Sequence, residues 1–155
     1  MLLAQYTKDE VKTALFQMVP TKAPGPDGFP AHFFQRHWDV CGEEVTRAVL
    51  RIVMGTESAK CINETILVLI PKVKNPTLLS QFCPISLCNV LYKLVSKVIA
   101  NRLKLVLPEL ISDSQSAFVP GRLITDNVLV SYEISHYLMN KKRGKDGVVA
   151  VKADM

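Results

Sequence analysis

The chain has 155 residues, of which 48% are hydrophobic and 21% charged, a composition that supports the core of one globular domain and excludes a disordered chain. Its 19 lysines and arginines outnumber its 14 acidic residues, and the formal net charge of +5 suits a polyanionic partner without requiring one. Apolar runs too short to span a bilayer and the lack of an N-terminal signal region predict an intracellular protein of the nucleus or cytoplasm that is neither secreted nor membrane-bound.

The N-terminal part of the chain predicts one helix followed by one tightly defined loop. Thr7 and Glu10 have the spacing of a capping box, and apolar residues follow at helical spacing, so we expect an amphipathic helix over 8–18. Residues 22–28 have the sequence Lys-Ala-Pro-Gly-Pro-Asp-Gly. Two prolines fix φ and two glycines allow positive φ, which indicates a loop whose backbone path is closely specified.

Two further helices and a pair of strands are expected next. A short aromatic-rich helix starts near Pro30, and a third helix covers about 43–54. The run Ile-Leu-Val-Leu-Ile over 66–70 predicts a buried strand, which is followed by a proline and Lys72. Residues 85–87, directly after another proline, predict a second strand.

The second half of the chain predicts two longer helices. The first covers about 89–107 and is closed by Pro108. Its inward face is expected to carry Leu91, Leu94, Val95, Val98, Ile99 and Leu103, and its opposite face to carry Lys93, Lys97, Arg102 and Lys104. A loop over 114–122 leads into the second helix, over roughly 124–140.

The last residues predict a strand that ends in a carboxylate. Val149 and Val151 alternate with smaller or polar residues, which is the period of a half-buried strand, so we expect a strand over 148–154. Asp154 then stands at the end of a rigid support, where a metal ligand is often held, although a terminal Asp is more commonly a solvated chain end. The basic residues at 141–145 are either a nuclear-import signal or a solvated turn.

Motifs of hydrolytic or zinc chemistry are not found in the sequence. The three histidines, His32, His37 and His136, accompany no nucleophile motif, and no glycine-rich phosphate loop of the usual kinds occurs. The four cysteines, at 41, 61, 83 and 88, have neither Cys-x-x-Cys nor zinc spacing. We therefore expect them to be reduced thiols of an intracellular protein.

The basic residues allow two interpretations. The lysines at 93, 97 and 104 form either the solvated face of a helix or a surface that follows a phosphate backbone. Lys72 stands directly after the strand and its proline, so its stem is anchored and its charge is aimed, as suits a triphosphate. Considered alone, such a lysine is more often structural.

Four blocks of sequence, in this order, carry a family resemblance: Lys22 to Gly28, Leu69-Ile70-Pro71-Lys72, Pro84 to Lys93, and Gln115 to Asn127. Together they resemble the N-terminal half of the reverse-transcriptase domain of LINE-type non-LTR retrotransposons, especially the plant branch, over essentially the whole chain. The resemblance implies an RNA-directed DNA polymerase of right-hand architecture. We expect an α+β fold, a partial domain over 1–155 with the mostly helical fingers region, a small β element and the first palm strand, without the rest of the palm or the thumb.

The resemblance also implies roles for individual residues. Lys72 would contact the phosphates of the incoming deoxynucleotide, and Arg122 would contact the nucleic acid, an RNA template with a DNA primer. Lys93 and Lys97 are further candidates for binding nucleic acid, on the basis of the basic helix face described above. Asp154 would be the first catalytic carboxylate of the palm and a ligand of Mg²⁺. In the intact family, two metal ions activate the primer 3′-hydroxyl and neutralise the leaving pyrophosphate.

The chain departs from the family pattern in three places. The pattern continues beyond Asp154, whereas this chain ends at Met155, and one carboxylate cannot hold two metal ions. Cys83 stands where the family has an arginine that clamps the triphosphate, and Ala153 replaces a larger apolar residue. We therefore expect that this chain does not retain Mg²⁺ and is inactive alone. The alternatives are a non-catalytic nucleic-acid-binding module and a functionless relic.

Overall fold

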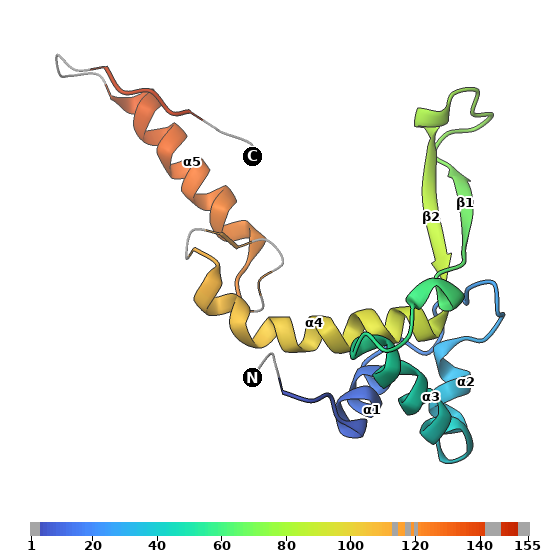
Figure 1. Cartoon of the computed structure of the whole chain (residues 1–155). Coiled ribbons are helices and arrows are strands. Elements are labelled where there is room, and N and C mark those ends of the chain that lie inside the picture. The colour runs from blue at the N-terminus through green and yellow to red at the C-terminus, as the bar shows by residue number, and fades with distance from the viewer. Residues whose placement is uncertain (1–3, 113–114, 117–118, 120, 142–146, 152–155) are drawn as a thin grey trace. The chain divides into compact units, whose positions relative to one another are not determined.

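The structure, a computed structural model, describes residues 4–112, 115–116, 119, 121–141 and 147–151 (Figure 1). The chain divides into two compact units, Met1–Leu103 and Lys104–Met155. The elements of the described residues are helices and one two-stranded antiparallel sheet, which confirms the α+β class. None of the helices described there is both long enough and apolar enough to span a bilayer.

The first helix, α1, covers Lys8–Phe16 and begins at the expected capping box. The Glu10 backbone N–H donates to the Thr7 hydroxyl at 3.3 Å, and the Thr7 backbone N–H donates to the Glu10 carboxylate at 2.8 Å. Both bonds give an acceptor to a backbone N–H that would otherwise have no hydrogen-bond partner at the start of the helix. The helix buries the apolar residues Val11, Ala14 and Leu15 and ends slightly earlier than expected.

Two more helices complete the first part of the core. Helix α2 covers Ala31–Arg36, directly after Pro30, and α3 covers Trp38–Val53, so α3 begins earlier than the sequence predicted. A Cβ at Gly42 would lie 2.7 Å from the Trp38 ring, so the glycine leaves room for the indole to fold back along α3. The buried residues of the core are Val11, Ala14, Leu15, Ala31, Phe34, Trp38, Val45, Val49, Val90, Leu94, Val95 and Val98.

The short 3₁₀ helix η1, Ala59–Ile62, precedes a β-hairpin, and a second one, η2, Leu79–Gln81, lies in the connection between the two strands of the hairpin. Strand β1, Thr65–Pro71, pairs antiparallel with β2, Phe82–Cys88 (Figure 1).

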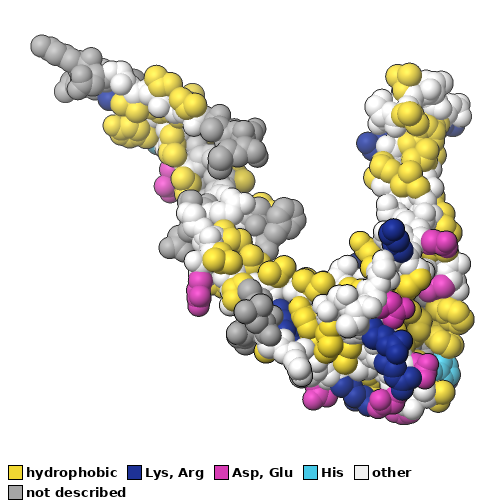
Figure 2. All heavy atoms as spheres, in the orientation of Figure 1, with side chains coloured by type: hydrophobic (Ala, Val, Ile, Leu, Met, Phe, Trp, Pro, Cys, Tyr) yellow, Lys and Arg dark blue, Asp and Glu magenta, His cyan; other side chains and the backbone are white. Residues whose placement is uncertain are grey.

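The prediction of a buried strand was wrong, because every residue of β1 is exposed and Leu67 is 62% exposed. Figure 2 shows hydrophobic side chains along the surface of this hairpin. The physical reason is that β1 and β2 pair only with each other among the described residues, so the ribbon lacks the covering layer that buries a strand.

Helix α4 covers Val90–Leu110 and includes Pro108, so the prediction that this proline closes the helix was wrong. A proline in the last turn removes few backbone hydrogen bonds, which explains why the helix continues past it. The predicted faces also need correction. Ile99 and Leu103 are 39% and 45% exposed, whereas Arg102, expected in solvent, is only 7% exposed. The buried stripe follows the four-residue spacing from Val90 through residues 94 and 98 to Arg102.

In the second unit, helix α5 covers Ile124–Asn140, which confirms the predicted bounds. None of its described residues is buried. The strand expected over 148–154 is not formed in its described part, because residues 147–151 have no strand pairing and Val149 and Val151 are largely exposed. A lone extended segment gains no ladder hydrogen bonds without a neighbouring strand. Asp154 lies outside the described residues.

Candidate functional site

The loop over residues 22–28 lies against the junction of β2 and α4. The Lys93 ammonium donates to the Ala23 carbonyl at 3.2 Å, and the Asp27 backbone N–H donates to the Asn89 side-chain oxygen at 3.2 Å. These two bonds join segments that are more than sixty residues apart in the chain. Two of the blocks that carry the family resemblance, 22–28 and 84–93, are therefore in direct contact.

Gly25 makes this contact possible. It is buried, and a Cβ at this position would lie 2.3 Å from the Asn89 backbone nitrogen and 2.4 Å from its side-chain oxygen. The Gly28 N–H donates back to the Gly25 carbonyl at 3.0 Å, and Gly28 has a φ of 74°, in the left-handed region. The path of the loop is closely specified, as the sequence predicted.

A basic pocket of about 220 Å³ lies beside this loop. Its lining residues are Gln17, Met18, Val19, Lys22, Ala31, Val90, Lys93 and Lys97. The structure thus brings together Lys93 and Lys97, two of the sequence-predicted residues, and adds Lys22 and Gln17, which sequence reasoning did not select. The only signal for Lys22 was its position at the start of the first block that carries the family resemblance, because the other two lysines of the pocket come from a distant helix.

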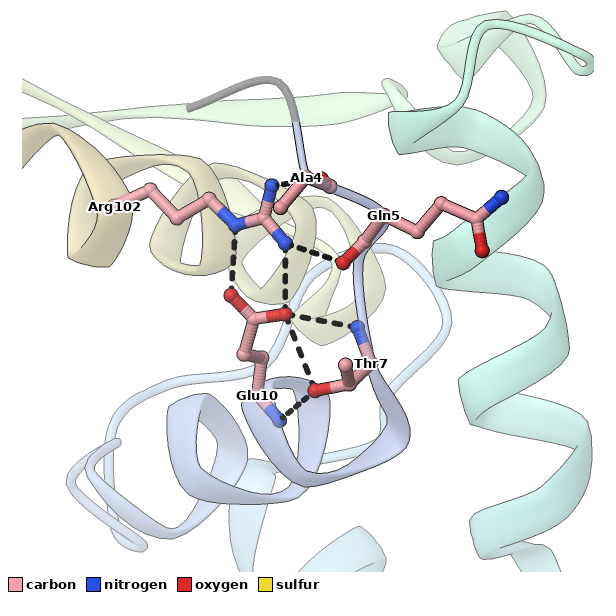
Figure 3. A network of polar contacts seen from close by, with 5 residues as sticks. All are labelled: Ala4, Gln5, Thr7, Glu10 and Arg102. Atoms are coloured by element: carbon pink, nitrogen blue, oxygen red, sulfur yellow. Dashed lines mark hydrogen bonds and ion pairs between the residues drawn. The ribbon is translucent and has the colours of Figure 1, made fainter. Parts of the chain in front are cut away.

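Arg102, another basic residue expected on this face of α4, has a different role. The Arg102 guanidinium donates from Nε to one oxygen of Glu10 at 2.7 Å and from Nη2 to the other at 2.9 Å (Figure 3). It also donates to the Gln5 carbonyl at 2.8 Å and to the Ala4 carbonyl. Arg102 therefore ties α4 to the start of α1 and does not form part of a basic surface.

Two further features describe the electrostatics of this pair. The Arg102 guanidinium carbon lies 3.5 Å from the centroid of the Tyr6 ring, the distance of a cation–π contact. The pKa of Glu10 is lowered from 4.5 to about 2. The largest cause is the hydrogen bond from Arg102; the bonds from Thr7 act in the same direction, and partial burial opposes them. Glu10 is thus held as a carboxylate.

Lys72 lies at the end of the hairpin. It follows the last residue of β1, its backbone N–H donates to the Gln81 carbonyl at 2.8 Å, and its ammonium donates to the Ser80 carbonyl at 3.4 Å. Cys83, the position at which the family resemblance leads us to expect an arginine, pairs with Ile70 at the same end of the hairpin and is exposed. Lys72 and Cys83 therefore lie at the same end of the hairpin.

The remaining predicted site residues lie in the second unit. The Arg122 guanidinium donates to the carbonyls of Gln115, at 2.7 Å, and Ser112, so it bridges the turn between α4 and α5. Asp154 lies outside the described residues, and so its role as a metal ligand stays a prediction. Elsewhere, the part of the chain that the structure describes holds no group of three or more His, Cys, Asp or Glu side chains arranged for a metal ion.

The chain matches no protein-family model. It is similar to a protein from Xenopus laevis, the transposon TX1 uncharacterized 149 kDa protein, with 38% identity over 131 residues. The match includes 84% of this chain and 10% of that protein. The chain is therefore related to a transposon protein and spans about a tenth of that relative's length.

Proposed function

We propose that this chain is the fingers region and the start of the palm of a reverse transcriptase from a LINE-type non-LTR retroelement. The relation to a transposon protein over 84% of the chain carries the proposal. The order of the four sequence blocks supports the polymerase assignment, and so does the direct contact between two of them, at Ala23 and Lys93. The part of the activity that this chain would supply is the binding of the RNA template, the DNA primer and the incoming deoxynucleotide.

Basic side chains at two places in the first unit support that role. The pocket beside the loop carries Lys22, Lys93 and Lys97, and the hairpin presents Lys72 at its end. Lysine ammonium groups bind phosphates as point charges, and each phosphate contact adds salt-dependent affinity. We assign the pocket to the nucleic-acid strand and Lys72 to the triphosphate, where the neutral Cys83 would leave the contact weaker than a guanidinium would.

Catalysis would require Mg²⁺, which supplies charge neutralisation at the reacting phosphate and a nucleophilic 3′-hydroxyl when it is bound. Asp154 is the residue that we propose as one of its ligands. A single carboxylate cannot hold two divalent ions, so polymerisation would require further metal ligands besides Asp154.

A salt titration of RNA binding tests the proposal. The purified chain is titrated against a labelled single-stranded RNA by fluorescence anisotropy, at increasing NaCl. We expect the logarithm of the binding constant to fall linearly with the logarithm of the salt concentration, with a slope of about −0.7 for each phosphate contacted. An affinity that ignored salt, or no binding at low salt, would overturn it.

A non-catalytic nucleic-acid-binding module is the second candidate function. The pocket with its three lysines lies wholly within the first unit and does not involve Asp154, so strand binding does not depend on a palm. Primer extension separates the two candidates. In a longer product of the same gene, extension that Asp154→Asn abolishes would support the polymerase, and RNA binding without extension would support the module.

A further inference from the structure

The basic pocket combines positive charge with an apolar floor. Three of its lining side chains are lysines, none is acidic, and two of its apolar residues, Ala31 and Val90, belong to the buried core. An enclosed surface that carries one sign of charge concentrates counter-ions at that place. The pocket therefore suits an anionic ligand that also has an apolar part.

The lysines are positioned from two sides. Lys93 and Lys97 are one helical turn apart on α4, so their side chains are neighbours, and Lys22 reaches the pocket from the loop. Lys93 uses one of its three N–H donors on the Ala23 carbonyl. The ammonium groups of Lys22 and Lys97 have no hydrogen-bond or ion-pair partner among the described residues. Three like charges around one pocket repel each other, and an anion between them would relieve that repulsion.

Gln17 adds a neutral donor. The Asn101 side-chain amide donates to the Gln17 side-chain oxygen at 3.1 Å, which fixes the orientation of the Gln17 amide and keeps its NH₂ group as a donor at the pocket wall. Met18 and Val19 continue this wall with apolar surface, and Val19 is half-exposed. The polar donors and the apolar surface thus lie side by side.

We infer that this pocket seats a phosphodiester group of a single-stranded polynucleotide on Lys22, Lys93 and Lys97, with an adjacent unpaired base against Met18 and Val19. The volume of about 220 Å³ is below that of pockets that enclose whole drug-sized ligands, and it suits one phosphate with its sugar. An unpaired base has an open face for apolar contact, which a base in a duplex lacks. This inference rests on the proposed function and gives it a specific contact site.

A pair of double variants tests the pocket. Lys22→Ala with Lys97→Ala removes two charges from the pocket, while Lys12→Ala with Lys60→Ala removes two charges from exposed positions outside it. Lys93 is kept, because it also holds the loop. We expect the pocket variant to bind single-stranded RNA about tenfold more weakly than the wild type, and its salt slope to be smaller by about 1.4. The control variant should keep both values close to wild type.

Thermal unfolding of both variants should match the wild type, since neither the Lys22 nor the Lys97 side chain donates a hydrogen bond in the described part of the chain. If the wild type binds RNA and the pocket variant binds it equally well, the assignment of the strand to this pocket is wrong and the proposed function stands. The same holds if both variants lose the same affinity. If the wild type binds no RNA, both are wrong.

Two competitors identify the ligand. A duplex of the same sequence should compete more weakly than the single strand for the wild type, and equal competition would overturn the role of the unpaired base. Adenosine monophosphate should fail to displace the strand at matched nucleotide concentration. Displacement by the mononucleotide would show a site for free nucleotides and overturn the assignment to a strand.

Discussion

Arg102 and Glu10, which are 92 residues apart in the chain, form a two-bond ion pair in which each carboxylate oxygen accepts from a different guanidinium nitrogen. Glu10 also closes the capping box of α1. One carboxylate therefore serves both the start of a helix and the attachment of a distant helix. Arginine–carboxylate pairs of this geometry are among the stronger charge-assisted contacts, so this pair is a suitable place to test the stability of the first unit.

Replacing Glu10 with Gln should destabilise the protein. The change removes the charge that pairs with the buried Arg102 and weakens the capping box. Because Glu10 is about one-third exposed, solvent screens part of the effect, and we expect a loss of about 2 kcal/mol in the free energy of unfolding. Urea denaturation at neutral pH measures it. Glu43→Gln, which breaks an exposed pair with Lys8, is the matched control and should leave the midpoint unchanged.

The contribution of Glu10 should depend on pH in a defined direction. Its pKa in the folded protein is lowered from 4.5 to about 2, so the folded state binds a proton less readily than the unfolded state does. The stabilisation is thus fully present above about pH 5 and is lost as pH falls from 4.5 towards 2. The difference in unfolding free energy between wild type and Glu10→Gln, measured at several pH values, should shrink over that interval. A difference that stayed constant would contradict the assigned pKa.

Replacing Gly25 with Ala should release the loop from the β2–α4 junction. The added Cβ would meet backbone and side-chain atoms of Asn89 at less than 2.5 Å, and we expect a cost of about 1–3 kcal/mol. Hydrogen exchange at the Asp27 amide, which donates to Asn89, should become faster. Gly28→Asn is the control, since nothing lies within 4 Å of that position and Asn tolerates a positive φ. Unchanged protection at Asp27 in the Gly25 variant would count against the docked loop.

Two leucines should respond very differently to truncation. Leu94 is fully buried in the core and Leu67 is 62% exposed on the hairpin. We expect Leu94→Ala to lower the free energy of unfolding by about 3 kcal/mol, and Leu67→Ala to change it by less than about 0.5 kcal/mol. Chemical denaturation of the two variants checks this. A large loss from Leu67→Ala would mean that β1 is covered in solution.

The elements with local signals were predicted well from the sequence. The start of α1 follows from its capping box, and the bounds of α5 agree with the range predicted for the second long helix. The exposure of β1 could not be predicted, because an apolar run shows the period of a strand and not whether a second layer covers it. The burial of Arg102 was missed because its charge was taken to exclude it from the core. Four-residue spacing places it on the same face as Leu94 and Val98, and its partner, Glu10, lies on a distant helix.

In the candidate site too, some residues were predicted from local spacing and others were placed by contacts between distant segments. Lys93 and Lys97 share a helix face because of their four-residue spacing, and the structure places both in one pocket. Lys22 joins them only because Gly25 allows the loop to approach Asn89, which is a tertiary contact. Arg122 donates to carbonyls of the preceding turn, a local role that the sequence did not indicate. Short-range periodicity predicts faces, and contacts between distant segments decide which faces meet.

The pairing register of the hairpin has a consequence for association between molecules. The bond from the Lys72 N–H to the Gln81 carbonyl marks a hydrogen-bonded pair, and such pairs alternate with non-bonded ones along an antiparallel ladder. Pro71, opposite Phe82, and Pro84, opposite Leu69, therefore both occupy non-bonded positions, where a backbone nitrogen points outward. Pro71 therefore removes one backbone donor from the outer edge of β1, and Pro84 removes one from the outer edge of β2, where a further strand would have to pair. Each outer edge of the exposed apolar hairpin thus lacks one backbone donor, which disfavours edge-to-edge pairing with another molecule.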